Sequence, residues 1–151
     1  MEIERKFLVK NIPLDLKEYD KAHIEQGYLS FNPEVRLRNK NGKYYLTVKG
    51  NGTISREEYE TEISCQTYNE LSSKMQGRLL VKDRYNIPLD TNCLAELDVY
   101  VNIAGITSTV EVEFTSIESA NGFTLPNWFG LEVTSDEKYK NKNLASIKKL
   151  N

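Results

Sequence analysis

The sequence begins Met1-Glu2-Ile3-Glu4-Arg5-Lys6, and this stretch decides the fold. Glu2, Glu4 and Lys6 are two residues apart, so in an extended strand their side chains share one face. The residues between them, which include Ile3, point to the opposite face. A strand with two carboxylates and an ammonium on one face borders either solvent or a polar interior that has a function. The rest of the chain must decide between these two alternatives.

The composition is that of an ordinary globular domain. The chain has 151 residues and a formal net charge of -2, so we expect residues 1–151 to form one domain with its own core. A nearly neutral chain argues against a surface that coats nucleic acid. The charged strand at residue 2 stands where a secretory signal would need an apolar run, and no stretch has the roughly 18 to 20 apolar residues that span a bilayer. We therefore expect a cytoplasmic protein with no nucleic-acid and no membrane partner.

Alternating β-forming residues predict further strands along the chain. The expected strands occupy residues 2–9, 23–31, 35–38, 43–49, 58–63, 79–89, 94–103 and 106–114. Asn41-Gly42 predicts a two-residue hairpin turn. Short helices are expected at 14–19, 66–75, 115–120 and 143–150, while 126–130 is expected to be irregular and 131–134 extended. This pattern predicts a mainly β (α+β) fold, an eight-stranded antiparallel closed β-barrel with flanking and plugging short helices.

Charges of one sign recur in pairs at alternating positions of these strands. The cations are Lys6, Arg36, Arg38, Lys49, Lys82 and Arg84, and the carboxylates are Glu2, Glu4, Glu58, Glu60, Glu96, Asp98, Glu111 and Glu113. A solvated sheet face would explain any single pair. The whole set fits better a barrel that turns its apolar face outward and its charges inward. Buried charges are costly unless they are paired or bind a ligand, so such an interior needs ligands.

Cations and carboxylates in one interior indicate polyanion binding with a divalent metal. Arg and Lys on separate strands can converge on phosphate oxygens. Carboxylates at alternating positions can supply the oxygen ligands that Mg²⁺ or Mn²⁺ prefers. His23 is the only histidine, which excludes a multi-histidine metal site. We interpret His23 as structural, so a Ser or Cys nucleophile lacks the partner histidine that a triad needs. Gly50-Asn51-Gly52 is too short for a Walker A loop and predicts a turn.

The ordered series of charged blocks resembles the CYTH domain family, also called triphosphate tunnel metalloenzymes. Glu2-Ile3-Glu4-Arg5-Lys6 is similar to the ExExK signature of that family. Later blocks follow in the same order as in the family: 35–38, 46–49, 58–60, 82–85, 96–100, 111–114 and the tail 130–134 with Tyr139, Asn141, Leu144 and Ala145. The resemblance runs nearly from end to end, and it implies an eight-stranded antiparallel barrel that forms a tunnel.

The resemblance also implies separate roles for the two signs of charge. It implies that the triphosphate is bound by Lys6, Arg36, Arg38, Lys49, Lys82 and Arg84, with Lys138 near the tail motif as a further contact. It implies that Mg²⁺ or Mn²⁺ is held by Glu2, Glu4 and Glu113, supported by Glu111, Glu58, Glu60 and Asp98. Glu4, Lys6 and Glu113 are the expected catalytic residues. The sequence does not decide whether the pair on this strand is Glu58 and Glu60 or Glu60 and Glu62, because Glu62 has the same parity.

The expected activity is metal-dependent hydrolysis of a triphosphate, foremost inorganic tripolyphosphate. The compact chain has no evident insertion that would grip a nucleobase, although ATP and thiamine triphosphate remain candidate substrates. One alternative is a class IV adenylate cyclase that converts ATP to cyclic AMP and pyrophosphate. Another is a non-catalytic module that binds polyphosphate or nucleotides. The oligomeric state stays open, since either helices or a homodimer would cover the apolar outer strand faces.

Overall fold

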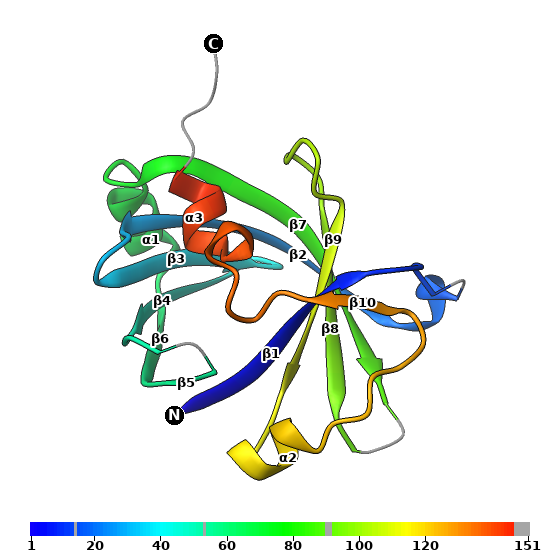
Figure 1. The fold of residues 1–151 in the computed structure, drawn as a ribbon. Coiled ribbons are helices and arrows are strands. Elements are labelled where there is room, and N and C mark those ends of the chain that lie inside the picture. Colours follow the sequence, from blue (N-terminus) through cyan, green and yellow to red (C-terminus); the bar gives the residue numbers. More distant parts are fainter. Residues whose placement is uncertain (14, 53, 90–91, 147–151) are drawn as a thin grey trace.

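The structure, a computed structural model, describes residues 1–13, 15–52, 54–89 and 92–146, and it contains an antiparallel sheet that curls into a nearly closed barrel (Figure 1). Around the barrel the long strands follow in the order β1 (Glu2–Val9), β9 (Ser108–Glu113), β8 (Leu94–Tyr100), β7 (Gln76–Pro88), β2 (Asp20–Ser30), β3 (Glu34–Lys40), β4 (Lys43–Lys49) and β6 (Glu58–Ile63). These eight strands confirm the predicted antiparallel barrel. The β3–β4 turn has positive φ angles of 51° at Asn41 and 84° at Gly42, as the hairpin signal predicted.

Two short strands pair with the second edge of β1; the sequence analysis missed the first of them and expected only part of the second, as the extended residues 131–134. β5 (Ser55–Arg56) pairs with Glu2 and Ile3, and β10 (Phe129–Glu132) pairs with β1 farther along. Within the described residues β6 does not pair with β1, so the barrel is nearly closed and its sheet has ten strands rather than eight. Strands of two and four residues are too short to show a period of two, so the expected extended segment 131–134 overlaps β10 only at residues 131 and 132, and residues 129 and 130 were expected to be irregular.

The helices are short and lie outside the barrel wall or at its end. They are η1 (Leu16–Glu18), α1 (Cys65–Ser72), α2 (Ile117–Asn121), η2 (Glu137–Tyr139) and α3 (Asn141–Ser146). The predicted helix at 66–75 begins one residue earlier, after the Ser64 cap, and ends at Ser72. Residue 14 and residues 147–150 of the predicted helices lie outside the described residues. In the described part of the chain, no helix is long and apolar enough to cross a membrane.

The apolar faces of the strands point outward, as the alternation predicted. Phe7, Leu97, Val110 and Val112 are fully buried in a cluster on the outer side of β1, β8 and β9. Helix α2 contributes Ala120 to this cluster. Apolar cover on the outside lets the opposite faces of the same strands carry charge toward the interior of the barrel, which we call the lumen.

One end of the lumen is closed by apolar side chains and helix α3. Tyr28, Leu80 and Tyr100 pack there against Leu144 and Ala145 of α3. In Figure 1, α3 lies beside β7, at the other end of the molecule from α2. Strand β7 approaches α3 so closely that a Cβ on residue 77 would lie 1.9 Å from the Ala145 carbonyl oxygen, and Gly77 has a φ of 69°. Glycine permits both the approach and this backbone conformation, so the predicted plugging helix is confirmed.

Candidate active site

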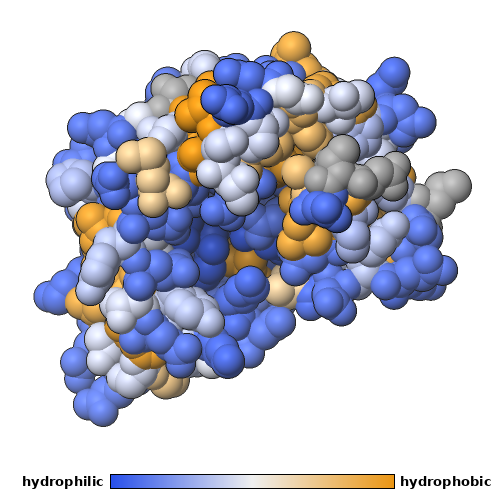
Figure 2. Space-filling model, turned by 90° about the horizontal axis from the view of Figure 1, so that it is seen from below, coloured by the Kyte–Doolittle hydropathy of each residue, from blue (hydrophilic) through white to orange (hydrophobic). Residues whose placement is uncertain are grey.

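The inward faces of the strands enclose a polar cavity of about 310 Å³. Figure 2 shows a hollow in the centre of the view whose visible wall is largely hydrophilic. Among the described residues, nine cationic ones line the cavity: Lys6, Arg36, Arg38, Lys40, Lys49, Arg56, Arg84, Lys140 and Lys142. Eight carboxylates of the same described ranges line it: Glu2, Glu4, Glu34, Glu58, Glu60, Glu96, Glu111 and Glu113. The alternating charges therefore face one lumen, and the solvated-sheet alternative is wrong for this set.

Most of the predicted site residues meet in this cavity. Those that line it are Glu2, Glu4, Lys6, Arg36, Arg38, Lys49, Glu58, Glu60, Arg84, Glu111 and Glu113. Glu62, the other candidate of the same parity on β6, is exposed and does not line it. The structure therefore brings the pair at 58 and 60 to the cavity, and not the pair at 60 and 62.

Three predicted site residues lie elsewhere. Lys82 and Asp98 are buried beneath the cavity floor, with 0% and 1% of their surface exposed, and they are not among its lining residues. Lys138 is exposed and outside the lining, and its Nζ lies 5.4 Å from the ring centroid of Tyr139. Lys140 and Lys142 line the cavity instead, because the chain turns through η2 and does not continue as a strand.

Several lining residues were not singled out from the sequence. Glu34 and Lys40 share the parity of Arg36 and Arg38 at the two ends of β3, so alternation could have found them. Arg56 lies on the two-residue strand β5, where no periodic signal exists. It contacts two lining carboxylates, with Nε 3.5 Å from Glu2 Oε1 and Nη1 3.2 Å from Glu34 Oε1.

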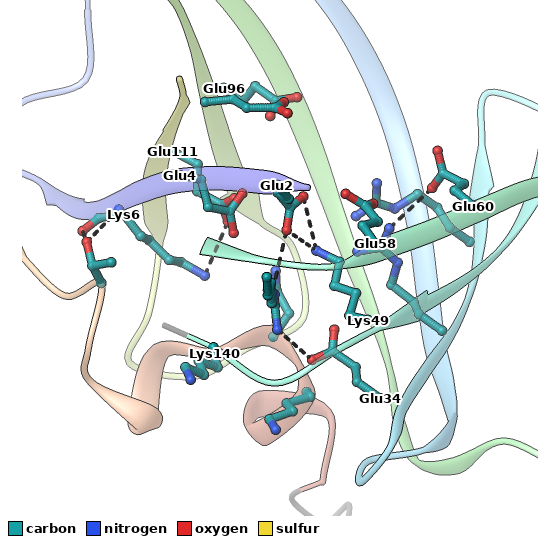
Figure 3. A pocket seen from close by; sticks show the side chains of 18 of the residues that line it. Glu2, Glu4, Lys6, Glu34, Lys49, Glu58, Glu60, Glu96, Glu111 and Lys140 are labelled. Atoms are coloured by element: carbon teal, nitrogen blue, oxygen red, sulfur yellow. Dashed lines mark hydrogen bonds and ion pairs between the residues drawn. The ribbon is translucent and has the colours of Figure 1, made fainter. Parts of the chain in front are cut away.

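Carboxylates from β1, β6 and β9 crowd together on one side of the lumen. The β1–β9 register places Glu4 opposite Glu113, and Figure 3 shows Glu4 and Glu111 side by side. Burial and the neighbouring Glu111 raise the pKa of Glu4 well above its usual value. Burial and a hydrogen bond with Glu2 raise the pKa of Glu58 to about 7. Because of their raised pKa values, Glu4 and Glu58 hold their protons to higher pH than a free carboxylate does, and a bound cation would displace those protons.

Two lysines on β1 and β4 balance part of this negative charge. Lys6 Nζ lies 3.5 Å from Glu111 Oε1 and donates a hydrogen bond of 2.8 Å to the Tyr139 carbonyl oxygen. Lys49 Nζ lies 3.0 Å from Glu2 Oε1. In Figure 3 both ammonium groups point toward the carboxylates of β1 and β9. Each lysine is therefore close to the acidic cluster as well as to the cavity.

The strands β7 and β8 hold a compact ion-pair group, which we call the β7–β8 wall: Lys82, Arg84, Glu96 and Asp98. Arg84 and Glu96 line the cavity, and Lys82 and Asp98 are buried beneath it. Arg84 donates from Nε and Nη2 to the two Asp98 carboxylate oxygens at 2.7 and 2.9 Å, and Lys82 Nζ lies 2.7 Å from Asp98 Oδ2. Burial would raise the pKa of Asp98, but Arg84 and Lys82 hold it well below its usual range. Burial, with Arg84 and Arg38 nearby, lowers the pKa of Lys82 to about 7, although the attraction of Asp98 opposes this shift.

Next to this group in the sheet, because β2 pairs with β7, is the β2–β3 wall, which comprises Gln26, Tyr28, Arg36 and Arg38. Arg38 donates from Nε and Nη2 to the Gln26 side-chain oxygen at 3.1 and 2.8 Å. Arg36 donates to the Thr47 hydroxyl at 3.3 Å, and its nearest carboxylate, that of Glu60, is 3.5 Å away. Burial and the charges of Arg36 and Arg84 lower the pKa of Arg38 to about 9. This wall therefore presents positive charge that adjacent carboxylates balance only in part.

The residues that could hold a metal are the lining carboxylates. Among the described residues, no three His, Cys, Asp or Glu side chains already converge on one metal position. The donors present are carboxylate oxygens on neighbouring strands, chiefly Glu2, Glu4, Glu58, Glu111 and Glu113. Hard oxygen donors suit Mg²⁺ or Mn²⁺, and the raised pKa values of Glu4 and Glu58 indicate where negative charge is concentrated.

An antiparallel barrel with guanidinium groups on one wall and a carboxylate cluster on another defines a protein that can bind a polyanion together with cations. The model of the CYTH domain matches residues 1–125, and the chain belongs to this family.

Two relatives are similar to this chain over nearly its whole length. One, from Nitrosomonas europaea, is an inorganic triphosphatase that is 42% identical over 147 residues, covering 95% of this chain and 96% of the relative. The other, the inorganic triphosphatase of Acetivibrio thermocellus, is 36% identical and covers 95% of this chain and 92% of its own. The crystal structure of the inorganic triphosphatase NE1496 matches with a TM-score of 0.72 at 39% identity, covering 99% of this chain and 97% of that chain.

Proposed function

We propose that this chain is a divalent-metal-dependent triphosphatase that hydrolyses inorganic tripolyphosphate. The observation that carries the proposal is the lumen itself, where the cationic β2–β3 wall faces the carboxylates of β1 and β9 across a cavity of about 310 Å³. Most of its lining residues are charged, which suits a substrate that consists of phosphate groups alone. The names of the two similar relatives support the same substrate.

The cations that line the lumen would bind the phosphate chain. Arg36, Arg38 and Arg84 offer guanidinium groups that match pairs of phosphate oxygens, and Lys6 and Lys49 add ammonium groups from the acidic side. Such preorganised donors also stabilise the charge that develops as a phosphoryl group is transferred. Lys140 and Lys142 would take the place that the sequence analysis gave to Lys138.

The metal ligands are proposed to be Glu2, Glu4, Glu58, Glu111 and Glu113, with Glu60 at the margin. Bound there, Mg²⁺ or Mn²⁺ would neutralise phosphate oxygens and polarise the phosphoryl group. On metal binding Glu4, whose pKa burial raises well above its usual value, would lose its proton, and Glu113, whose pKa burial also raises, would accept a proton from the attacking water. Asp98 is proposed to hold Lys82 and Arg84 in place rather than to bind metal, because both of its oxygens are already engaged.

We further propose that residues 1–151 act as one domain, since α3 near the end of the chain packs against β7 within the barrel. A cytoplasmic location and a homodimer remain predictions from the sequence.

Substrate assays separate the triphosphatase from its alternatives. The purified protein is incubated with Mg²⁺ or Mn²⁺ and with tripolyphosphate, ATP or thiamine triphosphate, and both phosphate and cyclic AMP are measured. We expect phosphate release, fastest from tripolyphosphate. Cyclic AMP formed from ATP without phosphate release from tripolyphosphate would instead identify a cyclase, and tight binding without turnover would identify a binding module.

Substitution of one carboxylate tests the metal site. Glu4→Gln keeps the size of the side chain and removes its charge, so we expect turnover to be lost and the fold to be kept. Glu62→Gln is the matched control, because Glu62 is exposed and does not line the cavity. A fully active Glu4→Gln protein would contradict the proposed metal site.

A further inference from the structure

Gln26 is an uncharged side chain next to Arg38, one of the arginines that line the lumen. It is fully buried on β2, and the register places it between Arg38 of β3 and Leu80 of β7. Neither the alternation of charges nor the proposed chemistry assigns it a role. A buried amide needs hydrogen-bond partners, so its partners indicate what it does.

The Gln26 amide connects Arg38 with Tyr28. Its oxygen accepts two hydrogen bonds from Arg38, at 3.1 Å from Nε and 2.8 Å from Nη2, which fixes the plane of the guanidinium group. Its nitrogen lies 3.4 Å from the Tyr28 hydroxyl, toward which it donates. Both Tyr28 and Arg38 line the cavity, while Gln26 itself does not. Gln26 therefore acts on the cavity through these two neighbours.

A comparison with Arg84, whose partner is a carboxylate, shows that the Gln26 amide supplies no negative charge to Arg38. Asp98 accepts from Nε and Nη2 of Arg84, the same two nitrogens that Arg38 offers to Gln26. Asp98 neutralises its arginine, whereas Gln26 orients its arginine and leaves the charge unbalanced. No carboxylate among the residues that the structure describes lies within ion-pair distance of Arg38.

We propose that Gln26 is a positioning residue for the bound phosphate chain, which holds the Arg38 guanidinium in place while leaving its positive charge available to a phosphate group. The proposal rests on the proposed triphosphatase function. A neutral acceptor is the suitable choice because a carboxylate at this position would compete with phosphate for the same guanidinium group. The result is an arginine that is oriented before the anion binds, which lowers the cost of binding.

The test is Gln26→Glu, which keeps the shape of the side chain and adds one negative charge. The variant protein should fold and should be at least as stable as the wild type, because the introduced carboxylate would pair with Arg38. KM for tripolyphosphate should rise by about tenfold or more, since one charge-assisted contact is weakened, while kcat changes less. Gln66→Glu on the exposed face of α1 is the control for added charge and should leave KM unchanged.

A second variant separates charge from packing. Gln26→Met has similar length but no acceptor, so Arg38 keeps its charge and loses its orientation. We expect a smaller rise in KM than in Gln26→Glu, by about two- to fivefold. Equal rises in the two variants, or a KM for Gln26→Glu within about twofold of the wild type, would overturn the proposal. Should Gln26→Glu fail to unfold cooperatively in urea, an unchanged KM in Gln26→Met would overturn it.

Equilibrium binding keeps this proposal distinct from the proposed function. Tripolyphosphate is titrated calorimetrically into the wild type and both variants in the presence of EDTA, which removes turnover. A wild type that binds tripolyphosphate without hydrolysing it with any divalent metal would refute the triphosphatase, yet weaker binding by Gln26→Glu would still support the role of Gln26. Equal dissociation constants for all three proteins would refute the role of Gln26 alone.

Discussion

The two cationic walls of the lumen differ in how their charge is balanced. In the β7–β8 wall, Asp98 engages both Arg84 and Lys82 at 2.7 Å. In the β2–β3 wall, Arg38 has the neutral Gln26 as its partner, and the carboxylate of Glu60 lies 3.5 Å from Arg36. The Glu60 side chain is 41% exposed, so solvent screens that pair. One wall is therefore neutralised within the protein, and the other keeps positive charge for a ligand.

This difference has an energetic consequence for each wall. A buried pair gains little over apolar packing but becomes very costly when one partner is removed. A buried cation without a carboxylate lowers the stability of the free protein, and a bound anion recovers that energy. The β7–β8 wall should thus respond to substitution mainly in stability, and the β2–β3 wall mainly in substrate binding.

The largest effect on stability is expected from Asp98→Asn. The variant leaves Lys82 and Arg84 buried without their shared carboxylate, so the free energy of unfolding should fall by about 3 to 5 kcal/mol. Urea unfolding measures this loss. Glu60→Gln is the control, because its half-exposed carboxylate should contribute less than about 1 kcal/mol. Unchanged stability together with weaker Mg²⁺ binding in Asp98→Asn would instead make Asp98 a metal ligand, as the resemblance implied.

Arg38→Met should change substrate binding more than stability, the opposite of Asp98→Asn. Loss of the buried charge stabilises the free protein, while the unpaired Gln26 oxygen destabilises it, so the free energy of unfolding should change by less than about 2 kcal/mol. KM for tripolyphosphate should rise by about 10- to 150-fold, as expected for the loss of hydrogen bonds to a charged group. Steady-state phosphate release gives KM, and urea unfolding gives the stability. A stability loss as large as that of Asp98→Asn would erase the distinction between the walls.

The pH dependence of stability sharpens the contrast with the acidic side of the lumen. The folded-state pKa of Glu58 is about 7, above the ordinary value of 4.5, so the folded protein keeps a proton that the unfolded chain has released. The contribution of Glu58 to stability therefore falls as pH rises from about 4.5 to about 7. Glu58→Gln should gain stability relative to the wild type between about pH 5 and about pH 7.5.

Thermal unfolding at the two pH values measures this gain. His23, whose pKa the hydrogen bond with Asp83 raises, is present in both proteins, so its contribution cancels in the comparison. Mg²⁺ should reduce the gain, because the metal replaces the proton in the wild type. A stability difference that is the same at both pH values would contradict the assignment of a shared proton to Glu58.

The smallest effect is expected at the mouth of the cavity. Lys140 lines the cavity and Lys138 does not, so Lys140→Ala should raise KM by about two- to fivefold, a magnitude typical of partly exposed charges. Lys138→Ala is the matched control and should leave KM within about twofold of the wild type. Steady-state assays of both variants measure KM. A larger rise in KM for Lys138→Ala would show that Lys138, as the sequence analysis expected, is the lysine that contacts the substrate.

The sequence was sufficient for the barrel and for the inward direction of its charges. Strict alternation in β1, β3 and β9 determines which side chains share a face, and apolar partners on the other face determine which side is covered. Alternation along a strand cannot distinguish a residue that lines the cavity from one that is buried beneath the cavity floor. Arg84 and Lys82 alternate on one strand, yet only Arg84 reaches the cavity.

The pairing of charges could not be predicted because it depends on register and depth. Asp98 looked like the other inward carboxylates until the β7–β8 register placed it opposite Arg84. Gln26 carries no charge, so it was absent from any pattern of charges, although it is the partner of Arg38. Lys138 and Lys140 have the same parity, and only the turn at η2 separates the exposed residue from the lining one.

The claim that the β2–β3 wall keeps its charge for a chain of phosphates is tested most directly by equilibrium binding. Tripolyphosphate and orthophosphate are each titrated calorimetrically into the wild type and into Arg38→Met, with EDTA present so that neither metal nor turnover contributes. We predict that the wild type binds tripolyphosphate much more tightly than orthophosphate, and that Arg38→Met weakens tripolyphosphate binding by about tenfold or more. Equal affinity of the two proteins for tripolyphosphate, or equal affinity of the wild type for the two anions, would contradict the claim.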